Sequence, residues 1–339
     1  MTATTPYTPF RLATSHNLES TGYILDVQVS PHGGNLVAPT SSGAVHVFDA
    51  GTLEGVNTLN VTDGSSRDVL SEVAFDTANP SLLWSGSKSG HIKLWDLRSG
   101  EAGLTLDGRS YMISARAPVL CLAVNSTRTL LAAGTELVGE DAMIPIWDIR
   151  AHPTPATTFM ECHSDDITQL RFHPSDPNAM ISGSTDGLIC LYNLATLEED
   201  DALYQVIKED SISKIGFFGP AYEYIYCLSH METFSLYKFL EGDKVFSFGD
   251  VRADSEAQQM KVDYLIDCVY DAAGQRMFLV TGDQSGNMGV LHVNLGRLEL
   301  VHTINGGHTD IVRGVHWDLQ RGSLVSGGED GIVSLWQNS

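Results

Sequence analysis

The chain has 339 residues, 42% of them hydrophobic and 18% charged, so it can form a hydrophobic core and does not have the composition of a disordered protein. An excess of acidic over basic residues gives a net charge of −22, which argues against nucleic acid or an anionic membrane as the main ligand. Such a protein attracts basic protein segments, although the acidity could equally serve solubility alone.

The cysteines and the first residues exclude further classes of protein. Five cysteines without a CxxC pair indicate neither a zinc site nor a disulfide framework. The first ten residues lack the features of a signal peptide, and the longest apolar run, Ala117–Val124, is too short to cross a bilayer. We therefore expect a protein of a reducing compartment, the cytoplasm, the nucleus or both.

In chain order, the first extended segment is Pro9–Thr14, and the sequence from there to Gln337 is typical of strands and turns. One pattern recurs: a tight turn that ends in glycine, then an alternating strand closed by an aromatic or large apolar residue. The closing residues are 45 to 54 residues apart, the spacing of four-stranded propeller blades. These closing residues are Phe48, Trp95, Trp147, Tyr192, Tyr237, Leu291 and Trp336.

The sequence therefore predicts an all-β fold, a single seven-bladed β-propeller over residues 9–337. Trp336 is on the third strand of the last blade, and only three residues follow it. We expect Pro9–Thr14 to supply the missing fourth strand, which closes the ring and removes an open sheet edge. Two loops are long, Arg109–Pro118 and Asp250–Val262, and the second favours a short helix at Ser255–Met260.

The segment from Gly307 to Trp336 resembles a complete repeat of the WD40 family, with Gly-His at its start, Gly-Glu-Asp-Gly in its turn and Leu-Trp at its end. In that family a loop His, a strand Ser, a turn Asp and a strand Trp form a buried hydrogen-bonded chain. The resemblance implies these roles for the residues His308, Ser326, Asp330 and Trp336. Such pairing is physically needed, because an unpaired carboxylate between blades would lose its hydration without compensation.

Other blades keep only part of this tetrad. Blade 4 has His163, Ser182 and Asp186, with Tyr192 in place of the Trp, and blade 2 has Ser89 where the Asp belongs. The last third of the chain is also similar to one particular member of the family, beyond the generic repeat residues. The matching runs are Ile225–Cys227, Asp250–Arg252, Asp263–Ile266, Gly306–His308 and Gly327–Asp330.

Catalytic chemistry is not indicated. The twelve histidines occupy repeat positions or alternate along strands, which favours structural roles over a metal site. The Ser-x-x-Lys motif at Ser85–Lys88 has no second catalytic group, and no glycine-rich turn precedes a helix that could bind phosphate. We expect a non-catalytic scaffold without cofactor or metal, and a monomer.

One candidate surface combines carboxylates on the rim formed by the turns between second and third strands and by the loops that connect the blades. We call it the acidic wall: Glu136, Glu140, Asp141, Glu161, Asp165 and Asp166, with Tyr111 beside it. Further acidic residues of the same rim are Glu209, Asp210, Asp254, Glu256 and Glu329. Carboxylates beside an aromatic ring suit Arg and Lys side chains, so we expect a basic protein ligand of the histone or ribosomal-protein type.

A second candidate surface lies on the opposite rim. Leu94–Arg98 and Ile146–Arg150 are WDxR boxes in consecutive blades. The pair resembles substrate receptors that dock on the damage-specific DNA-binding adaptor of cullin-RING ubiquitin ligases, which implies that Arg98 and Arg150 contact the adaptor. The alternative is that each Arg only bonds to its own turn.

Overall fold

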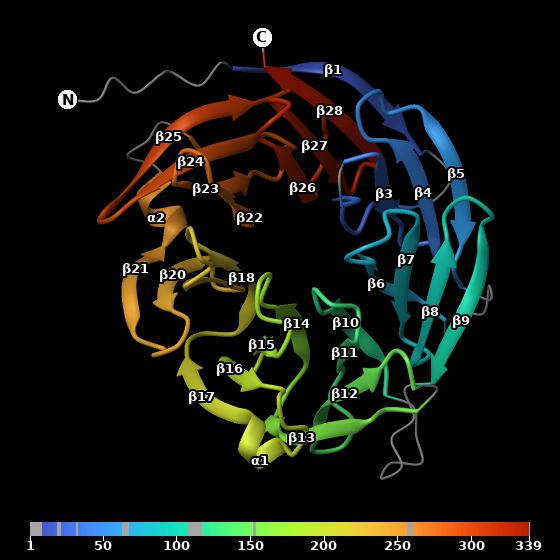
Figure 1. Ribbon diagram of the computed structural model, residues 1–339. Coiled ribbons are helices and arrows are strands. Elements are labelled where there is room, and N and C mark those ends of the chain that lie inside the picture. The colour runs from blue at the N-terminus through green and yellow to red at the C-terminus, as the bar shows by residue number, and fades with distance from the viewer. Residues whose placement is uncertain are drawn as a thin grey trace.

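The chain forms a ring of seven four-stranded antiparallel sheets (Figure 1). This computed structural model describes residues 9–18, 22–31, 33–62, 68–107, 117–151, 154–255 and 260–338. The prediction of an all-β, seven-bladed propeller is confirmed.

The strands follow the chain around the ring, four to a blade. Blades 1 and 2 contain β2 (Gln28–Val29), β3 (Asn35–Pro39), β4 (Ala44–Asp49), β5 (Gly55–Asn60), β6 (Leu70–Phe75), β7 (Leu82–Ser87), β8 (His91–Asp96) and β9 (Glu101–Asp107). Blades 3 and 4 contain β10 (Val119–Val124), β11 (Leu130–Thr135), β12 (Ala142–Asp148), β13 (Thr157–His163), β14 (Ile167–Phe172), β15 (Ala179–Ser184), β16 (Leu188–Asn193) and β17 (Leu203–Lys208). Blades 5 and 6 contain β18 (Ile212–Phe218), β19 (Tyr224–Ser229), β20 (Thr233–Lys238), β21 (Lys244–Asp250), β22 (Tyr264–Asp271), β23 (Arg276–Gly282), β24 (Met288–Asn294) and β25 (Arg297–Ile304). Blade 7 contains β26 (Val312–Asp318), β27 (Ser323–Gly328), β28 (Ile332–Asn338) and β1 (Phe10–Asn17).

The N-terminal strand closes the ring as predicted. β1 pairs antiparallel with β28, from Phe10 opposite Asn338 to Asn17 opposite Ile332, and Figure 1 shows the two strands side by side. The strand starts one residue later and ends three residues later than the predicted segment Pro9–Thr14. Because this outer strand covers β28, blade 7 has four strands like the others.

The recurring glycine turn has a backbone cause. Its glycine adopts a positive φ between 72° and 86°, a region that residues with a Cβ rarely enter. The glycines concerned are Gly43, Gly90, Gly187, Gly286 and Gly331. In blade 5 the same position before the third strand is occupied by Glu232, with φ at 59°. This explains why the repeat pattern is degenerate there although the strand is present.

Strand direction divides the loops between two rims. The turns between second and third strands and the inter-blade loops lie on one rim, here called the upper rim; the remaining turns lie on the lower rim. Helix α1 (Glu199–Ala202) follows the third strand of blade 4, and α2 (Val251–Ser255) follows the fourth strand of blade 5. The short helix therefore precedes the predicted segment Ser255–Met260, of which residues 256–259 lie outside the described residues.

The core lies between neighbouring blades. Between blades 4 and 5, for example, Ile189 of one sheet packs in one cluster with Ile212, Ile215 and Ile225 of the next, all fully buried. Inward-facing aliphatic side chains of adjacent sheets thus fix the loops of each rim at the ends of a rigid ring.

Candidate protein-interaction surfaces

Blade 7 contains a continuous hydrogen-bonded chain from the upper rim to its third strand. Trp336 Nε1 donates to Ser326 Oγ at 2.8 Å, Ser326 Oγ lies 2.7 Å from His308 Nε2, and His308 Nδ1 lies 3.2 Å from the Asp330 carboxylate. Two backbone N–H groups also donate to Asp330. Burial alone would raise the pKa of Asp330, but the hydrogen bonds and His308 lower it overall. This carboxylate is engaged inside the blade.

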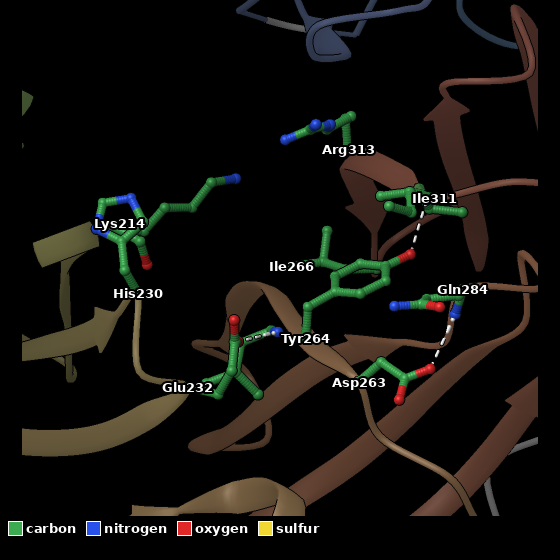
Figure 2. Close-up of a pocket in the computed structure, with 12 residues that line it drawn as sticks. Lys214, His230, Glu232, Asp263, Tyr264, Ile266, Gln284, Ile311 and Arg313 are labelled. Carbon is green, nitrogen blue, oxygen red and sulfur yellow. Dashed lines mark hydrogen bonds between the residues drawn. The ribbon is translucent and has the colours of Figure 1, made fainter.

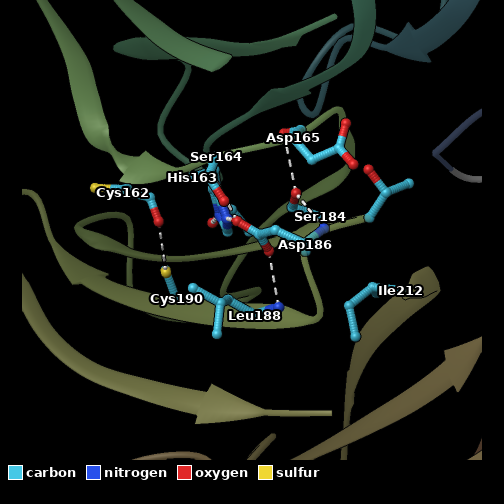
Figure 3. Close-up of polar contacts among 12 residues, drawn as sticks. Cys162, His163, Ser164, Asp165, Ser184, Asp186, Leu188, Cys190 and Ile212 are labelled. Atoms are coloured by element: carbon cyan, nitrogen blue, oxygen red, sulfur yellow. Dashed lines mark hydrogen bonds and ion pairs between the residues drawn. The ribbon is translucent and has the colours of Figure 1, made fainter. Parts of the chain in front are cut away.

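Blade 4 forms the same chain with a tyrosine at its end. Ser182 Oγ lies 2.6 Å from His163 Nε2 and 3.0 Å from Tyr192 Oη, so the phenol hydroxyl takes the place of an indole N–H. Figure 3 shows Asp186 between His163, whose Nδ1 is 3.0 Å away, and the backbone N–H of Leu188. Asp186 is therefore, like Asp330, held by groups of its own blade.

Two other blades have shorter versions. In blade 2, Trp95 Nε1 donates to Ser85 Oγ at 2.9 Å. In blade 5, the hydroxyl of Tyr237 donates to Glu209, and Lys244 Nζ lies 2.8 Å from the same carboxylate. Glu209 is thus neutralised within its blade, which removes it from the acidic residues that could receive a partner.

The acidic wall is assembled from three neighbouring segments of blades 3 and 4. Glu136, Glu140 and Asp141 lie in the turn between β11 and β12, and Asp165 and Asp166 lie in the loop between β13 and β14. The amide N–H of Leu137 donates to Asp166 Oδ1 at 2.8 Å, so this turn and this loop touch. Sequence reasoning placed Glu161 in the same loop; it lies instead on β13, because the outer strand continues to His163.

Among the residues that the structure describes, the wall has no cationic partner. Glu140 and Glu161 are exposed and the other four are half-buried. No ion pair within the described parts of the chain involves any of the six. Asp165 Oδ1 accepts the N–H of Asp166, which is a bond within the same loop. Tyr111, Glu256 and the side chain of Asp254 lie outside the described residues.

A cavity of about 460 Å³ opens on the upper rim between blades 5, 6 and 7 (Figure 2). Its walls are tied together: Tyr264 Oη accepts the N–H of Val312 at 2.8 Å, and Glu232 accepts the N–H of Leu265 at 2.7 Å. Lys214 and Arg313 point into it. Both cations already have acidic partners, Asp267 for Lys214 at 3.2 Å and Glu329 for Arg313, so the cavity does not present free charge of one sign.

The two WDxR arginines bond to their own turns. Arg98 donates from Nε and Nη2 to the two carboxylate oxygens of Asp96, at 3.0 and 2.6 Å, and Arg150 does the same to Asp148 at 2.8 and 2.7 Å. The hydrogen bonds from the arginines lower the pKa of Asp96 and of Asp148 to about 2. Both arginines are largely exposed, at 74% and 68% of the side chain.

Arg252 forms the same bidentate pair with Asp250, with N···O distances of 2.9 and 2.8 Å. That pair lies on the opposite rim and outside any Trp-Asp strand end. The same geometry thus occurs in three Asp-x-Arg turns of the described residues, and it accounts for Arg98 and Arg150 without a partner. The docking role of these two arginines stays a prediction.

The double substitution Arg98→Ala with Arg150→Ala tests that role. The melting temperature is expected to remain unchanged, because exposed ion pairs contribute little to stability. If the receptor alternative holds, the purified adaptor binds the unaltered chain and not the double variant in a pull-down. Failure of the unaltered chain to bind the adaptor would eliminate the alternative.

Metal sites and membrane-spanning helices are both absent from the described part of the chain. Within the described residues, no group of three or more His, Cys, Asp or Glu side chains is placed to hold a metal ion. Neither α1 nor α2, the helices of the described ranges, is long and apolar enough to cross a membrane.

Comparison with known proteins agrees with the geometry of blades 4 and 7. The WD40 family profile (WD domain, G-beta repeat) matches residues 154–193 and 298–337, the two segments that contain the complete hydrogen-bonded chains. The fold and these chains define a seven-bladed β-propeller of the WD40 type.

Relatives that match most of the length of this chain place it in a narrower group within the family. The WD repeat-containing protein 89 homolog of Dictyostelium discoideum is 33% identical over 335 residues, which cover 96% of this chain and 86% of the relative. An uncharacterized WD repeat-containing protein of Saccharomyces cerevisiae is 33% identical over 97% of this chain and 82% of its own length. The WD repeat-containing protein GTS1 of Arabidopsis thaliana is 31% identical over 80% and 71%.

The chain belongs to the WD40-repeat family, in the group of the WD repeat-containing protein 89 homolog. WD repeat-containing protein 89 is also the member to which the runs in the last third of the chain were similar, and that prediction is confirmed. Propellers of this family are in general protein-interaction scaffolds, so this chain is a scaffold of that general kind.

Proposed function

We propose that the acidic wall binds a basic segment of a partner protein, of the kind found in histones and ribosomal proteins. The observation that carries the proposal is the bond between Leu137 N–H and Asp166, which joins two acidic loops into one surface. This surface combines Glu140 and Asp141 of one loop with Asp165 of the other. Among the described residues, none of the three carboxylates forms an ion pair.

The physical reason is mutual repulsion of the carboxylates. Like charges on neighbouring loops raise one another's free energy, and an Arg- or Lys-rich segment relieves this through charge-assisted hydrogen bonds. The net charge of −22 adds a long-range attraction that guides basic partners to the surface. Both terms weaken as salt screens the charges, so the binding should depend strongly on ionic strength.

The test is a charge reversal of three wall residues, Glu140→Lys, Asp141→Lys and Asp165→Lys. Asp166 stays unaltered because it bridges two loops, and Asp186 and Asp330 stay because they lie inside blades. The affinity for a fluorescein-labelled dodecapeptide of alternating Lys and Gly is expected to fall about tenfold or more at low salt, because like charges now face one another across the interface. Fluorescence anisotropy measures the affinity, and circular dichroism checks the fold.

A matched control reverses three exposed carboxylates of the lower rim, Glu54→Lys, Glu101→Lys and Glu241→Lys. It changes the net charge by the same amount and should retain most of the peptide affinity. Equal losses in both variants would mean that only the total charge acts, and the acidity would then serve solubility alone. An unchanged affinity in the wall variant would reject the proposal.

A further inference from the structure

The lower rim has a second kind of cavity, lined by aromatic rings. It measures about 240 Å³ and lies where the inner strands β14, β18 and β22 end, in three adjacent blades. Five aromatic residues line it: Phe172, Phe217, Phe218, Tyr226 and Tyr270. All except Phe172 are half-exposed in the described chain. Aromatic side chains that remain accessible on one side are enriched where proteins bind partners.

The rings are held in place by their own contacts. Phe218 stacks on Tyr224 with ring centroids 5.2 Å apart and lies 6.1 Å from Tyr270. The ring of Tyr226 covers Gly216, where a Cβ would lie 2.5 Å from it, and its hydroxyl donates to Asp267 at 2.9 Å. The cavity is therefore formed before a partner arrives, and its π faces are fixed.

The charges around the mouth are acidic. Glu223 and Asp271 are in the lower-rim turns of blades 5 and 6, and besides burial both raise the pKa of Tyr270, which places them within electrostatic reach of its hydroxyl. In the pairing of strands β22 and β23, Arg276 lies opposite Asp271. At the inner end, Arg171 also lines the cavity and lies 3.8 Å from Glu72.

We propose that this aromatic cavity of the lower rim receives an arginine side chain from a partner protein. The guanidinium is planar and weakly hydrated and stacks on aromatic faces, while its stem is apolar. A volume of 240 Å³ is below that of pockets for whole small ligands and suits a single side chain. Glu223 supplies the charge complement at the mouth. The site is separate from the acidic wall, so it does not depend on the function proposed above.

The test uses the protein labelled with 3-fluorotyrosine and two probes, acetyl-Gly-Arg-Gly-amide and its neutral citrulline counterpart. The fluorine resonance of Tyr270, assigned with Tyr270→Phe, is expected to shift saturably with the arginine probe and not with the citrulline probe. The dissociation constant is expected on the order of millimolar, since a single side chain offers few contacts. The resonance of Tyr204, 41% exposed on β17, is the internal control and should not move.

Two substitutions locate the binding. Phe218→Leu keeps an apolar side chain and removes a π face, and Glu223→Gln removes one charge from an exposed turn. Each substitution is expected to raise the dissociation constant of the arginine probe about threefold. Glu241→Gln, an equally exposed lower-rim carboxylate of blade 5, is the matched control and should have no effect. Absence of the Tyr270 shift, an equal shift with citrulline, or indifference to both substitutions would each overturn the proposal.

Discussion

Removing residues 1–17, and with them strand β1, is expected to lower the free energy of unfolding by about 5 kcal/mol or more. The ring of Phe10 is 8% exposed and packs edge-on against Trp317, with centroids 5.4 Å apart. Loss of this side chain alone should cost about 3–5 kcal/mol. The deletion also removes the pairing with β28 and leaves that strand as an open edge. Urea unfolding followed by circular dichroism measures the change.

Complementation distinguishes loss of the strand from a general effect of truncation. A synthetic peptide of residues 9–18 should raise the melting temperature of the truncated protein in proportion to the logarithm of its concentration, because it binds only the folded state. Within the full chain, Phe10→Ala should be far more destabilising than Leu12→Ala, since Leu12 is 41% exposed on the same strand. A truncated protein as stable as the full chain would contradict closure by β1.

The number of blades could be predicted because the third strands of five blades combine two local signals. A turn glycine with positive φ and an alternating strand are both properties of a few consecutive residues, so they are readable in the sequence. The end of β1 could not be placed, because every residue after Phe10 on this outer strand is exposed and no alternation marks where pairing stops. The helix α2 at Val251–Ser255 was not predicted, because the propensity signal is weak over so short a segment.

The candidate surfaces were predicted less completely, because they depend on contacts between distant residues. The sequence indicates which carboxylates lie on the upper rim, but not that Asp166 is engaged by Leu137 or that Glu209 replaces a histidine beside Tyr237. The aromatic cavity was missed altogether. Its one local signal is the consecutive pair Phe217 and Phe218 at a strand end. Tyr226 is on the next strand of the same blade, and the other two aromatic residues come from neighbouring blades.

Trp336→Ala is expected to destabilise the protein by about 1–2 kcal/mol more than Leu291→Ala. The two residues occupy the same position on the third strands of blades 7 and 6, and each is 2% exposed. Both substitutions leave a cavity in the core, at a cost of roughly 2–5 kcal/mol. Only the Trp substitution also removes the donor that ends the chain from Asp330 through His308 to Ser326. The difference in stability is obtained from the midpoints of urea unfolding, provided that the free energy of unfolding depends on urea concentration with the same slope in both variants.

Blade 4 separates the contribution of hydrogen bonding from that of ring volume. Tyr192→Phe keeps the ring and removes only the hydroxyl that lies 3.0 Å from Ser182 Oγ, so it should cost about 1 kcal/mol, close to the excess expected for Trp336→Ala over Leu291→Ala. In blade 6 the position of Ser326 is taken by Thr281, but the apolar side chain of Leu291 has no donor for its hydroxyl, so no such excess can arise there. Equal losses for Trp336→Ala and Leu291→Ala, together with no loss for Tyr192→Phe, would mean that these hydrogen bonds do not stabilise the blades. Rigidity of the upper rim would then rest on the apolar packing between the sheets.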